Sequence, residues 1–223
     1  MNLALFDLDH TLLPLDSDNQ WGQFLVRTGA IDTEVFSRRN EQFFDDYKAG
    51  VLDARAYLEF ALGTLAPFSR DQLDTWHAQF MRDVVQPAIL PQALALVKHH
   101  QDKGDLVAIV TATNRFVTAP IAAAFGVSHL IAAEPEMHAD GRLTGGLIGT
   151  PTYAEGKVEH TLAWLAGMNK TLADFERSYF YSDSQNDIPL MTLVSNPVAT
   201  NPNALLTAHA NAQGWPLLTL FND

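Results

Sequence analysis

Two aspartates near the N-terminus, Asp7 and Asp9, have the types and spacing that most clearly predict chemistry. They follow the apolar run Leu3–Phe6 and are separated by one residue. Side chains at i and i+2 of an extended strand point to the same side, so the two carboxylates should meet at the end of a first strand. Two acids that close together raise each other's pKa unless a cation or a division of roles separates them. The pair therefore predicts acid–base or metal chemistry.

Threonines and a lysine occupy two further predicted strand-to-helix junctions. Thr111, Ala112 and Thr113 follow the apolar run 106–110 and precede a predicted helix, where a hydroxyl and free backbone N–H groups bind an anion such as phosphate. A simple helix cap by Thr111 or Thr113 is the alternative. Lys157 lies in a predicted first helical turn, where the dipole disfavours a cation by about 0.3–1 kcal/mol and a bound dianion would reverse the sign. Its alternative is a lysine that points to solvent.

Two more aspartates, Asp183 and Asp187, follow the apolar run 178–181. They flank small polar residues in a predicted turn and offer oxygen ligands to a hard cation such as Mg²⁺. Helix capping would explain either aspartate alone. It explains poorly the presence of both in a chain that also carries the Asp7 and Asp9 pair.

These four groups share one position, the end of a predicted strand. In open α/β sheets the carboxyl ends of parallel strands bring ligand sites together. Phosphoryl transfer needs a nucleophile, a metal, donors for the phosphoryl oxygens and an acid for the leaving oxygen. The four groups together supply each of these parts.

The apolar pattern predicts the elements that position these groups. Between positions 16 and 85, apolar residues at spacings of three and four predict helices only. Candidate N-cap residues precede these helices: Asp16, Ser17, Asp18, Asp32, Thr33, Asp53 and Ser69. From residue 91 onward helices alternate with apolar strands, which is typical of a parallel sheet with crossover helices, and a hairpin is expected around 139–142. The predicted helices are 19–26, 33–47, 54–65, 70–84, 91–103, 115–125, 154–166, 188–194 and 202–212, and the predicted strands after the first are 106–110, 129–133, 178–181, 197–199 and 216–221.

The predicted fold is α/β, a Rossmann-like, doubly wound and mainly parallel sheet with an all-helical cap inserted after the first strand. The expected catalytic core spans 1–15 and 86–223, and the expected cap domain spans 16–85.

Composition narrows the classes of function. The 223 residues carry 14 Lys and Arg against 26 Asp and Glu, a formal charge of −12 without a basic patch, which argues against a nucleic-acid or anionic-membrane partner. The absence of cysteine excludes disulfides, thiolate zinc sites and thiol catalysis. Apolar runs fall short of the roughly 18–20 residues that span a membrane, and the N-terminus lacks a cationic leader. We expect a cytoplasmic protein, and the sequence predicts no oligomeric state.

In their order along the chain, four segments resemble the haloacid dehalogenase superfamily, in its phosphoserine-phosphatase-like branch with a helical cap: Asp7-Leu8-Asp9-His10-Thr11, Thr111, Lys157 and Asp183-Ser184-Gln185-Asn186-Asp187. The resemblance implies a Mg²⁺-dependent phosphatase that hydrolyses a small phosphate monoester through an aspartyl-phosphate. Asp7 would be the nucleophile, and Asp9 the acid that protonates the leaving group and later deprotonates water. This division is physically sound, because a metal-bound Asp7 stays ionised while Asp9 can carry a proton if its side chain lies off the metal.

Two ligand sets follow from the resemblance. Mg²⁺ would be held by Asp7, the Asp9 carbonyl and Asp183, with Asp187 in a supporting position. The phosphoryl oxygens would be bound by Thr111, the backbone of Ala112, Lys157 and Asn186.

The same resemblance places a substrate-contacting acid nine residues after the nucleophile, at Asp16. An acid there would suit a cationic amine, as in phosphoserine or histidinol phosphate. The alternative for Asp16 and for Asp18 is to cap the first cap helix. Phosphoserine would also need a cap arginine for its carboxylate, but the candidates are better explained as solvated helix faces: Arg38, Arg39 and Arg55.

Several other residues carry weaker signals. Phe43, Phe44 and Tyr47 form an aromatic stripe at helical spacing, which favours cap core over a pocket lining. His10 is interpreted as structural, with its side chain away from Asp7 and Asp9.

Two other hypotheses use the same chemical groups. A phosphotransferase or mutase would pass the phosphoryl group to a second hydroxyl instead of water. A phospho-receiver domain would need a receiver aspartate at the end of a middle strand, and the candidate, Asp53, lies in the helical block. A non-catalytic phosphate-binding protein is disfavoured because every group that the reaction needs is present.

Overall fold

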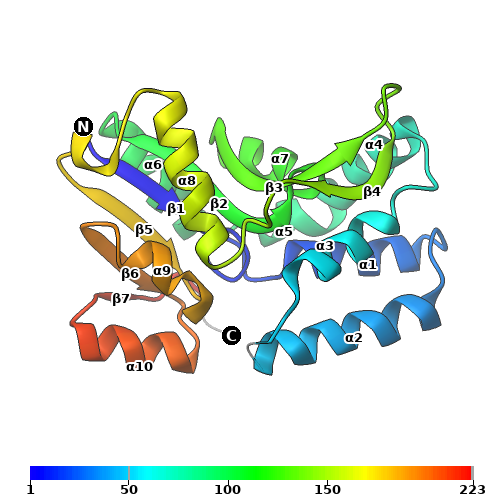
Figure 1. The fold of residues 1–223 in the computed structure, drawn as a ribbon, viewed down its shortest axis with the longest axis horizontal. Coiled ribbons are helices and arrows are strands. Elements are labelled where there is room, and N and C mark those ends of the chain that lie inside the picture. Colours follow the sequence, from blue (N-terminus) through cyan, green and yellow to red (C-terminus); the bar gives the residue numbers. More distant parts are fainter. Residues whose placement is uncertain (50, 222–223) are drawn as a thin grey trace.

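The computed structural model describes residues 1–49 and 51–221 and forms one seven-stranded sheet in the order β4-β3-β2-β1-β5-β6-β7 (Figure 1). The described strands are β1 (Leu3–Phe6), β2 (Leu106–Asn114), β3 (His129–Met137), β4 (Leu143–Ile148), β5 (Ser178–Ser182), β6 (Asn196–Thr200) and β7 (Leu217–Leu218). Neighbouring strands are parallel apart from β3 and β4, which form an antiparallel hairpin. The prediction of a Rossmann-like, mainly parallel sheet is confirmed.

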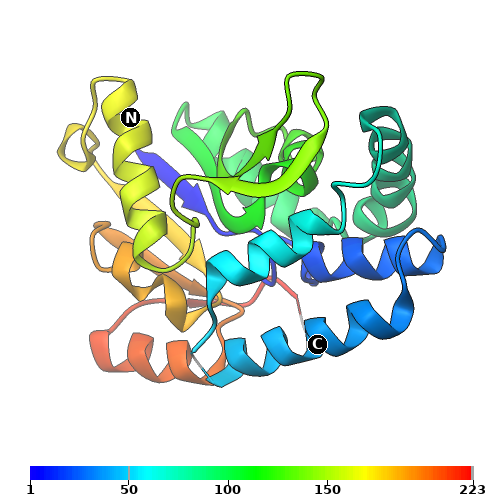
Figure 2. The same cartoon turned by 45° about the vertical axis from the view of Figure 1, so that its right-hand side comes forward.

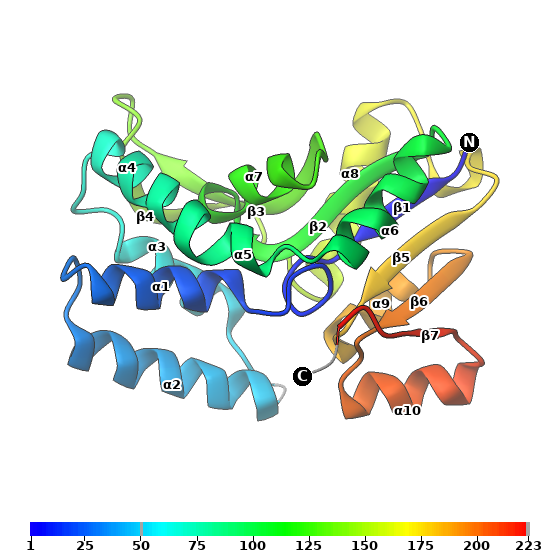
Figure 3. The same cartoon turned by 180° about the vertical axis from the view of Figure 1, so that it is seen from behind.

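Helices cover both faces of the sheet. Leu3 and Leu5 of β1 face α8 (Glu155–Gly167), α9 (Ile188–Met191) and α10 (Ala204–Gln213), whereas Ala4 and Phe6 face α6 (Pro91–Asp102) and α7 (Arg115–Ala124) (Figures 1 and 3). All four β1 residues are buried. Burial on both faces explains why the strand is a continuous apolar run instead of an alternating one.

The block after β1 is helical, as predicted. It contains α1 (Ser17–Arg27), α2 (Thr33–Ala49), α3 (Ala54–Gly63) and α4 (Arg70–Phe80), and α4 continues through the π-helical turn η1 (Met81–Val85) into α5 (Gln86–Ala88). Of the predicted N-cap residues, Asp16, Asp53 and Ser69 each accept a backbone N–H three residues further on, whereas Ser17, Asp18 and Thr33 lie inside the helices. Figure 2 shows α1 and α2 (blue) running side by side and α3 (cyan) lying along β4.

The helical block packs directly onto the sheet. Trp21 of α1 and Phe80 of α4 belong to the same apolar cluster as Phe6 of β1 and Val117 of α7. One contiguous apolar cluster therefore ties the helices of the expected cap to those of the expected core. The division at residues 15/16 and 85/86 stays a prediction.

Several element ends differ from the sequence prediction. β2 was expected to end at residue 110 but continues to Asn114, with a register shift against β3 after Val110, so the threonine segment belongs to the strand end. The last strand is only Leu217–Leu218, because only these two residues pair with β6. The short 3-10 turns η2 (Leu172–Asp174) and η3 (Gln185–Asp187) were not predicted, and η3 leads into the four-residue α9.

No helix in the described part of the chain is long and apolar enough to cross a membrane.

Candidate active site

The predicted site residues meet at one edge of the sheet. Asp7 follows β1, Thr111 lies near the end of β2, and Asp183 follows β5. These three strands are parallel neighbours, so their carboxyl ends open on the same edge. A single cavity at this edge is lined by every residue of the predicted site: Asp7, Asp9, Asp16, Thr111, Ala112, Lys157, Asp183, Asn186 and Asp187. The structure brings all of them together, while their individual roles remain predictions.

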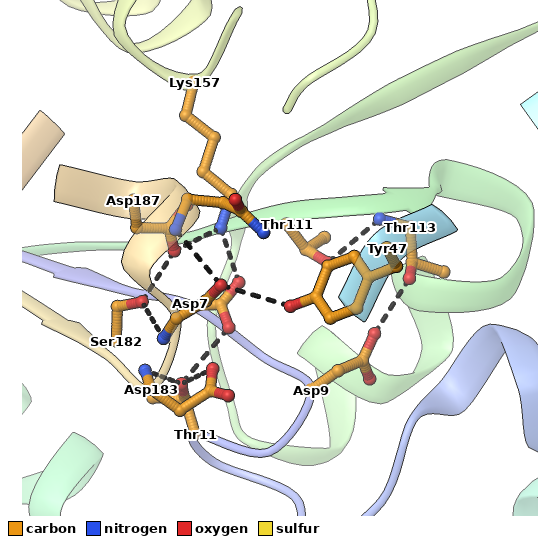
Figure 4. Close-up of polar contacts among 12 residues, drawn as sticks. Asp7, Asp9, Thr11, Tyr47, Thr111, Thr113, Lys157, Ser182, Asp183 and Asp187 are labelled. Atoms are coloured by element: carbon orange, nitrogen blue, oxygen red, sulfur yellow. Dashed lines mark hydrogen bonds and ion pairs between the residues drawn. The ribbon is translucent and has the colours of Figure 1, made fainter. Parts of the chain in front are cut away.

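Lys157 forms a buried ion-pair bridge between two aspartates. Its side chain reaches from α8 toward the sheet edge, and its Nζ lies 2.7 Å from Asp7 Oδ1 and 2.7 Å from Asp187 Oδ2 (Figure 4). Lys157 is only 3% exposed, so the alternative of a solvent-facing lysine is wrong. Burial alone would lower the pKa of Lys157, but the charges of Asp187 and Asp7 outweigh it and raise that pKa. The ammonium group is thus held charged beside Asp7.

The backbone before Lys157 explains its placement. A Cβ on Gly156 would lie 2.0 Å from the Pro151 carbonyl oxygen, so only glycine fits there. Ala154, which precedes α8, has a positive φ of 50°. This tight turn directs the first turn of α8, and with it Lys157, toward the end of β1.

Thr11 links the first and last acidic motifs. Its Oγ1 is 3.1 Å from Asp7 Oδ2 and 3.1 Å from Asp183 Oδ1, and it accepts the backbone N–H of Asp183 at 3.0 Å. One hydroxyl proton cannot serve both carboxylates at once. Burial and the charge of Asp7 raise the pKa of Asp183 well above its ordinary value. Asp7 and Asp183 are therefore two close acids that lack a full set of donors.

This donor set fits a hard cation. Carboxylate and carbonyl oxygens are the ligands that Mg²⁺ prefers. Within the described residues, no three acidic or histidine side chains stand together in a metal-binding arrangement. Asp187 is instead occupied by Lys157 and by the Ser182 hydroxyl, which donates at 2.6 Å. Asp7 and Asp183 are thus the two carboxylates that remain available to a cation, while the Asp9 carbonyl as a further ligand and the supporting place of Asp187 stay predictions.

The Asp9 side chain is held apart from this cluster. The backbone N–H of Ser17 donates to its Oδ1 at 2.9 Å, and the Thr113 hydroxyl donates to its Oδ2 at 2.8 Å (Figure 4). Burial raises the pKa of Asp9 to about 8, and the charges of Asp16 and Asp7 add to this effect. A carboxylic acid that keeps its proton near neutral pH is suited to general acid catalysis.

The helix-capping alternatives for the polar groups are wrong. Helix α7 is capped by Asn114, whose side chain accepts the Val117 N–H, and not by Thr111 or Thr113. Neither Asp183 nor Asp187 caps a helix with its side chain; Ser184 caps η3 instead. Thr111 and Ala112 are free to face the cavity, and Asn186 Nδ2 is buried there without a hydrogen-bond partner. That orphaned donor favours an anionic ligand.

The helical block supplies the opposite wall of the cavity. Asp16 caps α1 through the Asn19 N–H and also lines the cavity, so both hypotheses for it hold. Asp18 is not a cap, because its Oδ1 accepts instead from Asn114 Nδ2 at 3.2 Å. His10, expected to be structural, is largely exposed and lines the cavity.

The aromatic stripe on α2 is more than cap core. Phe43 and Tyr47 line the cavity, which corrects the prediction, and the side chain of Phe44 lies outside the described residues. The Tyr47 hydroxyl is 3.1 Å from Ser184 Oγ and joins α2 to the loop after β5. Burial raises the pKa of Tyr47 to about 12. Helical spacing shows which residues share a face, but not that this face meets the sheet edge.

Sequence reasoning missed Tyr57 and Tyr153, which also line the cavity, because neither stands in a motif. The cap arginines lie elsewhere, as expected: Arg38 pairs with Glu34, Arg39 lies over the Phe43 ring, and Arg55 contacts Glu59 and the Gly149 carbonyl.

Comparison with known proteins identifies the family. The haloacid dehalogenase-like hydrolase family matches residues 4–192. Histidinol-phosphatase from Neisseria meningitidis serogroup C is 44% identical over 217 residues, 97% of this chain and 98% of that protein. A crystal structure of a protein of unknown function from Bordetella pertussis Tohama I is 54% identical, with a TM-score of 0.93 and 99% of each chain covered. The chain belongs to the haloacid dehalogenase-like hydrolases, and the predictions of this family and of an enzyme are confirmed.

The fold extends to more distant structures. A substrate-bound phosphoserine phosphatase has a TM-score of 0.67 at 18% identity, covering 97% of this chain and 91% of that one. At this identity the likeness supports the fold alone, a phosphoserine-phosphatase-like arrangement of sheet and helices.

Proposed function

We propose that this chain is a Mg²⁺-dependent phosphatase that hydrolyses histidinol phosphate through an aspartyl-phosphate on Asp7. The observation that carries the reaction is the placement of Asp7, whose carboxylate contacts the buried Lys157 on one side and Thr11 on the other. These contacts fix the carboxylate at the floor of the cavity. The family and the Neisseria relative, a histidinol-phosphatase by name, support the proposal.

The proposed reaction has two steps. A carboxylate oxygen of Asp7 attacks phosphorus, the bond from phosphorus to the ester oxygen breaks, and that oxygen takes a proton from Asp9. Asp9 then accepts a proton from water as the water oxygen attacks the phosphorus of the aspartyl-phosphate, which releases inorganic phosphate and restores Asp7.

The surrounding residues stabilise charge in both steps. Lys157, the Thr111 hydroxyl, the Ala112 N–H and Asn186 would contact the phosphoryl oxygens. Mg²⁺, held by Asp7, the Asp9 carbonyl and Asp183 with Asp187 behind them, would neutralise negative charge at the phosphoryl group. Lys157 also places a positive charge 2.7 Å from Asp7 Oδ1, beside the proposed nucleophile.

The charge of the cavity narrows the substrate. Its described lining holds six aspartates, a single lysine and no arginine. Asp16, at the N-cap of α1, brings a carboxylate from the helical block into the same cavity as the phosphoryl-binding groups, where a leaving group would contact it. A cationic leaving group is favoured there, and a carboxylate is disfavoured. Histidinol phosphate carries an amine and no carboxylate, whereas phosphoserine carries both, so the lining supports the former.

A kinetic screen tests this proposal. Histidinol phosphate, phosphoserine and a neutral phosphomonoester are incubated with the enzyme and Mg²⁺, without any acceptor alcohol, and released phosphate is measured. We expect the highest kcat/KM for histidinol phosphate and loss of turnover with excess EDTA. Phosphate release that appears only after an acceptor alcohol is added would support the phosphotransferase hypothesis. A stable phosphoprotein without turnover would support the receiver hypothesis.

A further inference from the structure

Asp18 is a buried acid that neither capping nor the proposed mechanism uses. It stands in the first turn of α1, is only 6% exposed and lines the cavity. One of its oxygens, Oδ1, accepts a hydrogen bond from Asn114 Nδ2 at 3.2 Å. The other, Oδ2, is buried without a hydrogen-bond partner. A buried acceptor without a hydrogen bond lowers the stability of the fold, because it has lost its contact with water and gained no donor in return. A ligand that donates to Oδ2 would remove this penalty.

The groups around Asp18 leave room only for a donor. The Tyr57 hydroxyl of α3 lies close enough to Asp18 to lower the Asp18 pKa by hydrogen bonding, Asn114 donates to Oδ1, and the nearby acid Asp16 disfavours a second negative group. No basic side chain pairs with Asp18 within the described chain. Burial, with the charge of Asp16, raises the pKa of Asp18 to about 7, as expected for a carboxylate that lacks a cation. A ligand N–H that carries positive charge would complete this environment.

The position of Asp18 also suits the leaving group. Ser17, the residue before it, holds the Asp9 carboxylate through its backbone N–H. Asp18 therefore directly follows Ser17, whose backbone N–H positions Asp9. In the proposed reaction Asp9 is the acid that faces the ester oxygen. Asp9 and Asp18 also line the same cavity, so a leaving group that contacts Asp9 lies in the cavity that Asp18 faces.

We propose that Asp18 determines specificity for a protonated amine or imidazole on the leaving group, by accepting a charge-assisted hydrogen bond at Oδ2. This inference rests on the proposed phosphatase function and adds a second, buried acid to Asp16. Hydrogen bonds to charged groups are stronger than neutral ones, so a loss at Asp18 should fall on cationic ligands and spare neutral ones.

The test compares Asp18→Asn with a matched control. Asn keeps an oxygen that can accept from Asn114 but removes the negative charge. Asp71→Asn is the control, because Asp71 occupies the same second position of helix α4 and is exposed. Full steady-state kinetics are measured on histidinol phosphate and on n-propyl phosphate, which has no nitrogen. Binding of histidinol, which needs no turnover, is measured by calorimetry.

For Asp18→Asn we expect kcat/KM on histidinol phosphate and the affinity for histidinol to fall by about tenfold or more, with less than about a twofold change on n-propyl phosphate. Asp71→Asn should behave as wild type. Equal losses on both esters, or unchanged histidinol affinity, would overturn the role of Asp18 while leaving the phosphatase intact. Absence of turnover by the wild-type enzyme on both esters would instead contradict the proposed function, and the histidinol titration would still decide the role of Asp18.

Discussion

At the scale of single residues, the site is a balance between buried acids and one buried base. Lys157 lies within 2.7 Å of both Asp7 and Asp187, and all three side chains are largely removed from water. Such a triad is stable only when every charge has a partner, because an isolated buried charge is costly. The same contact positions the carboxylate of the proposed nucleophile Asp7, so stability and reactivity both depend on it.

Replacing Lys157 should therefore reduce both stability and activity. For Lys157→Met we expect the free energy of unfolding to fall by about 3–5 kcal/mol, because two buried carboxylates are left facing each other. Urea unfolding at neutral pH measures this change. Lys98→Met is the control, since Lys98 pairs with Asp102 on the surface and its loss should have little effect.

A second replacement distinguishes charge from packing. In Lys157→Met/Asp187→Asn one of the two unpaired carboxylates is neutral, so part of the lost stability should return. A double variant as unstable as the sum of the two single variants would show that packing, and not charge, is what Lys157 provides.

Motif spacing predicted which residues meet at the site but not how deeply each is buried. Asp7, Lys157 and Asp183 could be predicted because their types and order match one reaction. The free oxygen of Asp18 could not, since capping residues and buried acids look alike in a sequence. Exposure and unmet hydrogen bonds arise only when segments distant in the chain, here α1 and β2, come together.

At the scale of elements, the contact between α1 and α2 shapes the wall of the cavity. Gly22 of α1 lies directly under the ring of Phe36, and a Cβ there would come within 2.1 Å of the ring. The two helices can therefore approach closely only because residue 22 has no side chain. In the sequence, a glycine inside a helical pattern signals only a weaker helix.

Gly22→Ala should destabilise the protein although alanine favours helix more than glycine does by about 1 kcal/mol. The clash with Phe36 must move α2, so we expect a net loss of about 1–3 kcal/mol, read from thermal and urea unfolding. The control is Gly63→Ala in α3, where a Cβ would meet nothing within 4 Å and should be neutral or stabilising. A Gly22→Ala protein more stable than wild type would contradict the close packing of α1 on α2.

Element type was predicted more reliably than element length. Helix caps such as Asp53 and Ser69 are local hydrogen-bond signals and were confirmed. The extension of β2 to Asn114 was missed, because threonine suits both a strand and a helix start. Pairing with β3, a neighbour in the sheet but not in the sequence window, decides between the two.

At the scale of the whole molecule, two buried histidines link the stability of the fold to pH. His100 lies between Asp105, 2.8 Å from Nδ1, and the Tyr181 hydroxyl, 2.9 Å from Nε2. His77 Nε2 contacts the Val117 carbonyl at 3.0 Å inside an aromatic cluster. Burial lowers the pKa of both histidines below 6.5. The charged and titratable groups around them are Asp74 and Arg70 at His77, and Asp105, Tyr179, Tyr181, His99 and Lys103 at His100.

Each of these two histidines should contribute a loss of stability on mild acidification. A lowered folded-state pKa means that the unfolded chain binds more protons, so the contribution of each histidine is complete above pH 6.5 and is lost as the pH falls through the folded-state pKa. The buried acids Asp9, Asp18 and Asp183, whose folded-state pKa values are raised, act in the opposite direction over the same range. The histidine contribution, a loss of about 1–3 kcal/mol in unfolding free energy between about pH 7.5 and pH 5.5, is therefore measured by urea unfolding as the difference between wild type and histidine variants. Asp105, whose pKa is also lowered, contributes only below this window.

Replacing His77 or His100 by Gln should remove the histidine contribution, so the unfolding free energy of the variant should increase relative to wild type as the pH falls from about 7.5 to about 5.5. Replacing the exposed His138 by Gln should not. An unchanged slope in both buried-histidine variants would assign the pH dependence to other groups.

The central claim is that Asp7 attacks the phosphorus of the substrate, and its direct test is the rate of phosphate release from histidinol phosphate by Asp7→Asn in the presence of Mg²⁺. The amide keeps the shape of the carboxylate but is a poor nucleophile, so the rate should fall by at least about a thousandfold while circular dichroism shows a folded protein. Turnover within about tenfold of the wild-type rate would contradict the claim.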